Sequence, residues 1–232
     1  MNFKELQKVY IIAEIGVNHG GCVQNAIKMI DAAKLSGANA VKFQTFTAQS
    51  LVTLETPKVK YQESSTPSNE DHYSMIKNLE LSKEDHLKIF NHCNSIDIDF
   101  ISTPYDLDSA KFLNEIGVSI FKVASADIVD LPLHEYLASL NKPVIIATGM
   151  STLGEIDEVV KIYRKHKSLN ICLLHCVSNY PCSNESLNLS AISTIALTFQ
   201  LPVGFSDHSV GNIAACLSTA LGVKVIEKHF TT

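Results

Sequence analysis

The amino-acid sequence predicts an α/β fold, a (β/α)8 or TIM barrel, because short apolar and amphipathic segments alternate along all 232 residues. Most of the apolar segments are continuous, which is typical of parallel strands buried on both faces. Eight of them are predicted as strands: Val9–Ile15, Ala40–Thr45, Asp99–Thr103, Ser119–Ala124, Pro143–Thr148, Asn170–Cys176, Pro202–Ser206 and Val223–His229. A doubly wound open sheet is the alternative architecture for the same alternation.

The segments between these strands carry helix signals. Residues Asn25–Ser36 place apolar side chains at helical spacing. Ser82, followed by acidic residues, predicts the N-cap of a helix that continues to about Ser95. In the same way, Thr152 predicts the cap of a helix over Leu153–Lys165. Strands and helices therefore alternate as a barrel requires.

One connection and the C-terminal end of the sequence are unusual. The segment from Phe46 to about Leu81 is long and polar, and long connections are typically functional. The last predicted strand ends at His229, close to the end of the chain at Thr232. We therefore expect a single barrel domain over residues 1–232 that lacks its last helix, either open on that side or a fragment.

Composition argues against several protein classes. Hydrophobic residues make up 46% of the chain, too many for a disordered protein, and the net charge of −5 argues against a nucleic-acid surface. No apolar run approaches the roughly 20 residues of a membrane span, and residues 1–6 lead directly into the first strand without a secretory signal. We expect a cytoplasmic protein that binds neither nucleic acid nor a membrane.

The six cysteines are expected to be free thiols in a reducing compartment. Three of them, Cys172, Cys176 and Cys182, lie close together in the sequence. A zinc site is the alternative for this group, although no Cys-x-x-Cys pair is present.

Polar side chains end nearly every predicted strand. The main examples are Glu14, Lys42, Gln44, Thr103, Lys122, Ser125, His175, Ser178, Ser206, Asp207, His208, Glu227 and His229. The carboxyl ends of the strands form the active site of (β/α)8 enzymes, so these residues predict one convergent site. Side chains alternate along a strand, which puts Ser206 with His208 and Glu227 with His229 on shared faces.

Lys42 and Lys122 interrupt otherwise apolar strands. A buried ammonium group is costly without a partner, so two lysines on different strand ends favour a pocket for a phosphate or carboxylate. The alternative is that each aliphatic stem packs along the barrel with its head in water.

His208 and His229 end neighbouring strands, each beside an acidic residue, Asp207 or Glu227. This arrangement favours a divalent-metal site, with an acid/base pair as the alternative. Glu14 is predicted to act as a base, to hold a water molecule or to pair with a lysine.

Nine short motifs lie at or near the predicted strands. They are Ala13–Gly21 (AEIGVNHGG), Val41–Thr45 (VKFQT), Ile101–Asp106 (ISTPYD), Phe121–Ser125 (FKVAS), Thr148–Met150 (TGM), Leu173–Cys176 (LLHC), Asn179–Pro181 (NYP), Gly204–His208 (GFSDH) and Glu227–Thr231 (EKHFT). With these motifs in this order, the chain resembles the N-acetylneuraminate (sialic acid) synthase family over nearly its whole length. The family also includes legionaminate, pseudaminate and spore-coat polysaccharide synthases.

The resemblance implies a barrel that condenses phosphoenolpyruvate with an open-chain N-acetylated amino sugar similar to N-acetylmannosamine. The products are a nine-carbon ulosonic acid and phosphate. Carbon 3 of phosphoenolpyruvate attacks the sugar aldehyde, water attacks carbon 2, and phosphate leaves with carbon–oxygen cleavage. The resemblance also implies a divalent metal, Mn²⁺ or Mg²⁺, on His208 and His229, which polarises the aldehyde.

Site residues follow from the matching motifs. The resemblance implies catalytic roles for Glu14, Lys42, Lys122, His208 and His229. It implies contacts to phosphoenolpyruvate from Lys42, Thr103, Lys122, Ser125, Ser178 and Ser206. It implies contacts to the sugar from Glu14, Gln44, Asp127 and Tyr180.

The chain departs from the sialic acid pattern at Asp127, Ala147 and Ser178, where glutamate, serine and asparagine are usual. These differences favour the legionaminate or spore-coat branch. The resemblance implies a C-terminal antifreeze-like domain that completes the partner's site in a domain-swapped dimer. We expect residues 1–232 to lack this domain, and we expect the full-length form to be a homodimer. Two alternatives to the synthase are a non-catalytic truncated barrel that binds only phosphoenolpyruvate, metal or a partner subunit, and another metal-dependent barrel enzyme such as a sugar isomerase.

Overall fold

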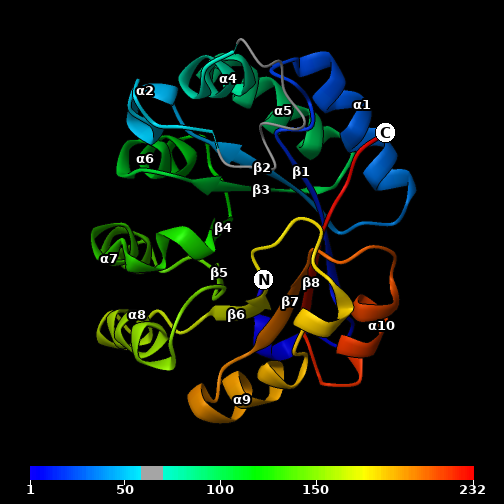
Figure 1. Cartoon of the computed structure of the whole chain (residues 1–232), viewed down its shortest axis with the longest axis vertical. Helices are drawn as coiled ribbons and strands as arrows, with labels where there is room; N and C mark the ends of the chain where they lie inside the picture. Colours follow the sequence, from blue (N-terminus) through cyan, green and yellow to red (C-terminus); the bar gives the residue numbers. More distant parts are fainter. Residues whose placement is uncertain (59–69) are drawn as a thin grey trace.

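The computed structural model describes residues 1–58 and 70–232, which form a closed barrel of eight parallel strands (Figure 1). The strands pair in sequence order, and the last pairs with the first. They are β1 (Tyr10–Gly16), β2 (Ala40–Thr45), β3 (Asp99–Pro104), β4 (Ile120–Val123), β5 (Val144–Ala147), β6 (Ile171–Cys176), β7 (Val203–Asp207) and β8 (Val225–His229). The predicted barrel and its eight strands are confirmed, and the doubly wound alternative is wrong.

The sheet closes between its last and first strands, so the alternative of a barrel that is open on that side is wrong. In the register of β1 and β8, Tyr10 lies opposite Val225 and Glu14 lies opposite His229. Within the described residues, no helix follows β8.

Helices surround the barrel and follow the strands in turn (Figure 1). They are α1 (Val23–Leu35), α2 (Ala48–Leu51), α4 (His72–Leu79), α5 (Lys83–Ser95), α6 (Leu107–Glu115), α7 (Leu131–Ser139), α8 (Leu153–Lys165), α9 (Ser190–Phe199) and α10 (Ile213–Thr219). Three short 3-10 helices are η1 (Phe3–Glu5), η2 (Ser125–Val129) and η3 (Asn184–Ser186). The long connection after β2 contains α2 and α4 rather than a continuous loop, and its residues 59–69 lie outside the described part of the chain.

The two predicted N-caps are present. The side chain of Ser82 accepts a hydrogen bond from the backbone N–H of Asp85, at 3.0 Å, and opens α5. Thr152 and Glu155 form a reciprocal capping box at the start of α8. Each cap satisfies backbone donors that the first helical turn leaves unpaired, which explains why these helices begin where the sequence predicts.

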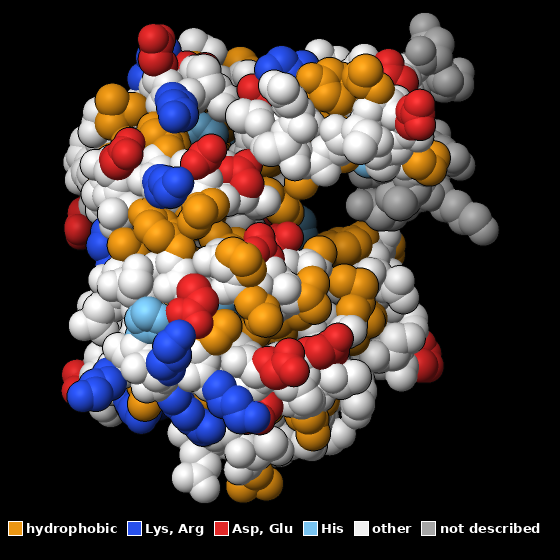
Figure 2. Space-filling model, turned by 90° about the vertical axis from the view of Figure 1, so that its left-hand side faces the viewer, with side chains coloured by type: hydrophobic (Ala, Val, Ile, Leu, Met, Phe, Trp, Pro, Cys, Tyr) orange, Lys and Arg blue, Asp and Glu red, His pale blue; other side chains and the backbone are white. Residues whose placement is uncertain are grey.

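The surface over α6, α7 and α8 carries Lys, Arg, Asp and Glu side chains interspersed with hydrophobic ones (Figure 2). None of the helices in the described ranges is both long and apolar enough to cross a membrane. The six cysteines are free, as predicted.

The interior of the barrel is layered, with an apolar floor beneath a polar upper layer. The floor consists of side chains that point inward from the first halves of the strands: Tyr10, Ile12, Ala40, Ile101, Ile120, Ile145, Cys172 and Val225, with Leu174 above them on β6. Phe3, on η1, is fully buried against this floor and plugs the bottom of the barrel. Figure 1 places the N-terminus in the middle of the ring of strands.

Gly204 shows how narrow the interior is. A Cβ atom at this position would lie 2.3 Å from Cδ2 of Leu174 and 2.6 Å from the carbonyl oxygen of Val225. No other residue fits there unless β8 moves outward. The glycine therefore lets β7 approach its neighbours closely enough for the strand ends to converge on one site.

Phe3→Ala should destabilise the protein by about 3–5 kcal/mol, because it removes a fully buried aromatic ring and opens the floor of the barrel. Urea denaturation measures the free energy of unfolding. Leu197→Ala is the control, because this side chain on α9 is 79% exposed and its loss should change stability by less than about 0.5 kcal/mol. Equal stability of the two variants would contradict the plug.

Candidate active site

Four charged side chains meet inside the barrel at the carboxyl ends of the strands. Glu14, Lys42, Lys122 and Glu227 come from β1, β2, β4 and β8, and each is at most 5% exposed. Nζ of Lys42 lies 2.8 Å from Glu14 and 3.7 Å from Glu227. Nζ of Lys122 lies 3.7 Å from the other oxygen of Glu227. The carboxylate of Glu227 therefore lies between the two ammonium groups, and the sequence prediction of two interior lysines is confirmed.

The two carboxyl groups have pKa values displaced in opposite directions. Burial raises the pKa of Glu14 to about 7, and the negative charge of Glu227 adds to this, while Lys42 opposes it. Burial would also raise the pKa of Glu227, but the charges of Lys122 and Lys42 outweigh it and lower that pKa to about 2. At neutral pH Glu227 is a fixed anion, whereas Glu14 is poised to gain or lose a proton.

The two lysines also differ. Burial lowers the pKa of Lys122. For Lys42 burial acts in the same direction, but the charges of Glu14 and Glu227 outweigh it and raise its pKa. Lys42 also donates a hydrogen bond to Thr103 at 3.3 Å, so these two side chains lie together inside the barrel.

Small polar side chains from the ends of β4 and β6 converge on Gly149, which follows β5. Its backbone N–H donates to Oγ of Ser125 at 3.0 Å, and that oxygen lies 3.0 Å from Sγ of Cys176. A Cβ atom on Gly149 would lie 2.7 Å from Cys176, 2.8 Å from Ser125 and 2.9 Å from Oγ of Ser178. We call Ser125, Gly149, Cys176 and Ser178 the cradle. Cys176 lies within electrostatic range of Lys122, so the cradle adjoins an ammonium group.

His208 and His229 face each other across the ends of β7 and β8, with ring centroids 5.5 Å apart. Nδ1 of His208 donates to the carbonyl oxygen of Val177 at 2.7 Å, because a carbonyl can only accept. Nε2 of the neutral ring therefore carries a lone pair. Ser206 lies 3.3 Å from that nitrogen and donates to Glu227 at 2.8 Å.

This pair fits a divalent metal by the chemistry of its donors. Burial lowers the pKa of both histidines, to about 4 for His229, so both rings are neutral at physiological pH, as metal coordination requires. A backbone carbonyl that fixes the tautomer of His208 is the usual partner of a metal-binding histidine. Among the residues that the structure describes, no third His, Cys, Asp or Glu completes a metal-binding group with them.

The predicted sugar-binding residues lie around this centre. Gln44 lies beside Glu14, since a Cβ on Gly16 would contact both side chains, at 3.6 and 3.1 Å. The ring of Tyr180 lies 4.2 Å from that of His208 and 5.6 Å from that of His229.

Asp127, on η2, has a buried Oδ2 atom that accepts no hydrogen bond. Burial and then the charge of Asp130 raise the pKa of Asp127 to about 6. An unsatisfied buried carboxylate oxygen is costly, and this oxygen is free to accept a further hydrogen bond.

Tyr105 is a site residue that we missed. Its phenol lies within electrostatic range of Asp127, Glu14, Tyr180 and Glu227, and its ring packs edge-on against Phe46. Burial, followed by the neighbouring carboxylates, raises its pKa, so it stays protonated and can donate a hydrogen bond. The signal was present in the sequence, because Tyr105 follows Thr103 by two residues and so shares its face.

Two of the predicted polar strand ends point away from the site. His175 faces the helices, where its Nε2 donates to the carbonyl of Leu187 at 2.7 Å and its ring stacks on Phe205. Asp207 also faces outward and pairs with Lys228 at 2.8 Å. Grouping Asp207 with His208 as neighbours in one metal or acid/base site was therefore wrong, since successive side chains of a strand point in opposite directions.

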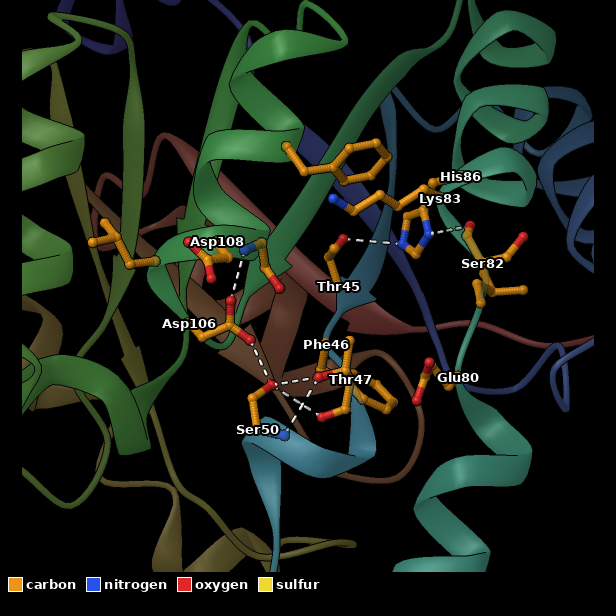
Figure 3. A pocket seen from close by; sticks show the side chains of 14 residues that line it. Thr45, Phe46, Thr47, Ser50, Glu80, Ser82, Lys83, His86, Asp106 and Asp108 are labelled. Carbon is orange, nitrogen blue, oxygen red and sulfur yellow. Dashed lines mark hydrogen bonds between the residues drawn. The ribbon is translucent and has the colours of Figure 1, made fainter.

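A cavity of about 550 Å³ lies beside this site, between the N-termini of α5 and α6 (Figure 3). Its polar groups bind one another: His86 bridges Thr45, at 3.0 Å, and the carbonyl oxygen of Ser82, also at 3.0 Å, while Asp106 caps α6. These contacts hold the helices against β2. The cavity is lined by none of the four interior charged residues and by neither His208 nor His229.

Comparison with known proteins identifies the relatives of this site. Residues 29–232 match the NeuB family. The chain belongs to the NeuB family. This membership confirms the resemblance inferred from the nine motifs, which include the strand ends that carry both lysines and both histidines.

Several NeuB relatives are similar along almost the whole chain. The N,N'-diacetyllegionaminic acid synthase of Legionella pneumophila is 46% identical over 96% of this chain and 64% of its own length. SpsE, a spore coat polysaccharide biosynthesis protein of Bacillus subtilis, is 38% identical over 96% of the chain and 60% of its own length. The N-acetylneuraminic acid synthetase structure from Leptospira borgpetersenii, in complex with citrate, has a TM-score of 0.85 at 38% identity and covers 97% of this chain and 74% of its own. The chain thus spans somewhat less than two thirds of the first two relatives.

Lys42→Met should raise the pKa of the Glu14 carboxyl above about 7, because it removes the ammonium group 2.8 Å away that opposes the effect of burial. Deprotonation of Glu14 would then occur at more alkaline pH. Infrared carboxylate bands recorded against pH, with the Glu14→Gln spectrum subtracted, measure this pKa. Lys161→Met, on the surface of α8, is the control and should leave it unchanged. A lower pKa in Lys42→Met would contradict the assigned electrostatics.

Proposed function

We propose that this chain condenses phosphoenolpyruvate with an N-acetylated amino sugar and water, giving an ulosonic acid and phosphate. The observation that carries the proposal is the placement of two buried lysines, Lys42 and Lys122, inside the barrel beside the cradle. Phosphoenolpyruvate has two anionic groups, and two ammonium groups at separate strand ends suit such a ligand. Relatives named as legionaminic, pseudaminic and N-acetylneuraminate-9-phosphate synthases support the same reaction class.

The anionic substrate would use both lysine subsites. Lys122, with the N–H and hydroxyl groups of the cradle, would hold one anionic group of phosphoenolpyruvate. Lys42 and Thr103 would hold the other, with Ser206 as a further hydroxyl donor nearby. The negative charge of Glu227 favours the protonated form of both lysines, and for Lys122 it opposes the lowering of the pKa by burial.

Glu14 would handle the proton transfer. Its pKa of about 7 allows it to take a proton from the attacking water or to give one to the oxygen of the sugar aldehyde. Because Glu14 lies beside Gln44, it would lie at the sugar subsite. Asp127 would accept a hydrogen bond from a hydroxyl or amide of the sugar through its unpaired Oδ2, and Tyr180 would contact the sugar from above the histidines.

His208 and His229 would hold a divalent cation, Mn²⁺ or Mg²⁺. When bound, the cation supplies a Lewis acid that polarises the sugar aldehyde. The protein's own part is to present two neutral imidazoles, one with its tautomer fixed by Val177.

The identity of the sugar is the finer part of the proposal. The relatives at 46% and 42% identity are both N,N'-diacetyllegionaminic acid synthases, so we propose a 2,4-diacetamido hexose ahead of N-acetylmannosamine. A homodimeric full-length form and a cytoplasmic location stay predictions.

Phosphate release that requires both phosphoenolpyruvate and an amino sugar tests the reaction, with Mn²⁺ and a panel of N-acetylated hexosamines. We expect sugar-dependent release, reduced at least about 100-fold in Lys122→Met because one anion subsite is lost. Lys161→Met should retain full activity. No release by a folded chain would favour the alternative of a barrel that only binds ligand, and release without phosphoenolpyruvate-derived carbon in the product would contradict condensation.

Gly149→Ala should weaken phosphoenolpyruvate binding about tenfold or more. The added Cβ would lie within 2.9 Å of three cradle side chains, which must turn away and lose their inward positions. Calorimetric titration with phosphoenolpyruvate measures the affinity. Gly154→Ala, on α8, is a matched control because its Cβ would meet nothing closer than 3.8 Å. Unchanged affinity in Gly149→Ala would remove the cradle from the anion site.

A further inference from the structure

An ion pair on the outer faces of β7 and β8 joins the two residues that directly precede the histidines. Asp207 and Lys228 lie opposite each other in the parallel register of these strands. Nζ of Lys228 is 2.8 Å from Oδ2 of Asp207. The carboxylate is buried, whereas the lysine side chain is 32% exposed. The pair thus crosses between the strands at the level where the histidines point inward.

Ser209 completes this arrangement on the other side of His208. Oδ1 of Asp207 accepts from the backbone N–H of Ser209 at 2.9 Å and from its hydroxyl at 2.6 Å. Lys228 donates a second hydrogen bond to the carbonyl oxygen of Ser209 at 2.8 Å. We call Asp207, Ser209 and Lys228 the outer clamp. It ties both neighbours of His208 to the residue that precedes His229.

The outer clamp lies where the strand ladder ends. Asp207 and Lys228 form the last pair of the β7–β8 register, so the backbone does not hold the histidines together beyond it. His208 is fixed on its own side, because its carbonyl accepts from the N–H of Cys182 at 2.8 Å and its ring donates to Val177. His229 lies opposite Glu14 in the β1–β8 register, and the N–H of Phe230 donates to the carbonyl oxygen of Glu14 at 2.8 Å, so β1 holds this strand end on one side. On the side of β7, the outer clamp links the two strand ends that carry His208 and His229.

We propose that the outer clamp sets the separation of His208 and His229, and that Lys228 is a positioning residue for the divalent cation that they would hold. The cation part rests on the proposed function. Without Lys228, the buried carboxylate of Asp207 keeps only the two donors of Ser209 and loses its cationic partner. A buried charge that loses its partner is strongly unfavourable, so the strand ends would rearrange to hydrate it.

Lys228→Gln, Lys228→Arg, Ser209→Ala and His208→Ala test this proposal, with Lys161→Gln as a control that breaks an exposed ion pair on α8. The probe is Mn²⁺ alone, with free Mn²⁺ quantified by electron paramagnetic resonance. We expect Lys228→Gln to weaken Mn²⁺ binding about 10- to 100-fold, as loss of a group that orients a metal ligand typically does. Lys228→Arg should restore binding to within about threefold, and Lys161→Gln should match the wild type.

Crystal structures of the wild type and of Lys228→Gln provide a readout that needs no metal. We expect the histidine centroids, 5.5 Å apart in the intact protein, to move apart in Lys228→Gln and to return in Lys228→Arg. An unchanged separation in the folded variant would overturn the clamp. If Lys228→Gln does not fold, Ser209→Ala, which removes one donor and no charge, should still lengthen the separation, and its failure to do so would overturn the clamp too.

The two proposals fail in different ways. If Mn²⁺ binds equally to the wild type and to His208→Ala, the metal assignment is wrong, and the crystallographic comparison alone decides the clamp. If His208→Ala abolishes binding but Lys228→Gln binds as the wild type does, the metal site stands and the positioning role of Lys228 is wrong.

Discussion

The placement of four charges inside the barrel governs the rest of this structure. A single ion moved from water into a protein interior costs several kcal/mol, and the cost is offset only when opposite charges and hydrogen bonds surround it. Glu14, Lys42, Lys122 and Glu227 meet this condition only because β8 closes against β1, which brings the two carboxylates onto adjacent strands. Assembly of the site therefore requires closure of the barrel. The apolar floor under this layer, with Phe3 at its base, supports the same charges from below.

Each strand end has two functions, divided between its two faces. On β7 and β8 the inward side chains include His208, Glu227 and His229, while the outward pair of Asp207 and Lys228 joins the strands to each other. On β2 and β3 the outward pair is Thr45 and Ser102, 2.7 Å apart and linked through Thr45 to a buried histidine of α5. Polar side chains behind the sheet thus fix the strands whose other faces must hold charged groups at set distances. A site made from eight strand ends needs such contacts, because each end is otherwise held only by its backbone ladder.

The sequence predicted the barrel and the two interior lysines for the same physical reason. Strands buried on both faces read as continuous apolar runs, and an ammonium inside such a run must have a partner. The sequence could not predict the cradle. Gly149 is needed there because Ser125, Cys176 and Ser178 leave no space for a Cβ atom, and these residues come together only in the folded barrel. The sequence did not predict the short helices α2 and α4, because the connection that contains them is polar and shows no clear apolar periodicity. The outward direction of Asp207 was available from strand alternation, and proximity to His208 in the sequence was given too much weight.

The charge balance of the site bears on the role of Glu14. Lys42 lies 2.8 Å from Glu14, and its positive charge lowers the pKa of the Glu14 carboxyl against the effect of burial. If the proposed function holds, phosphoenolpyruvate brings a phosphate and a carboxylate next to both lysines. The negative charges of these groups would offset the positive charge of the lysines, which lowers the pKa of Glu14 in the free protein. Binding of the anion would therefore raise that pKa further and leave Glu14 protonated when the sugar arrives. A neutral carboxyl donates a hydrogen bond, so in that complex Glu14 would act first as an acid toward the aldehyde oxygen, and as a base only after the proton has been transferred.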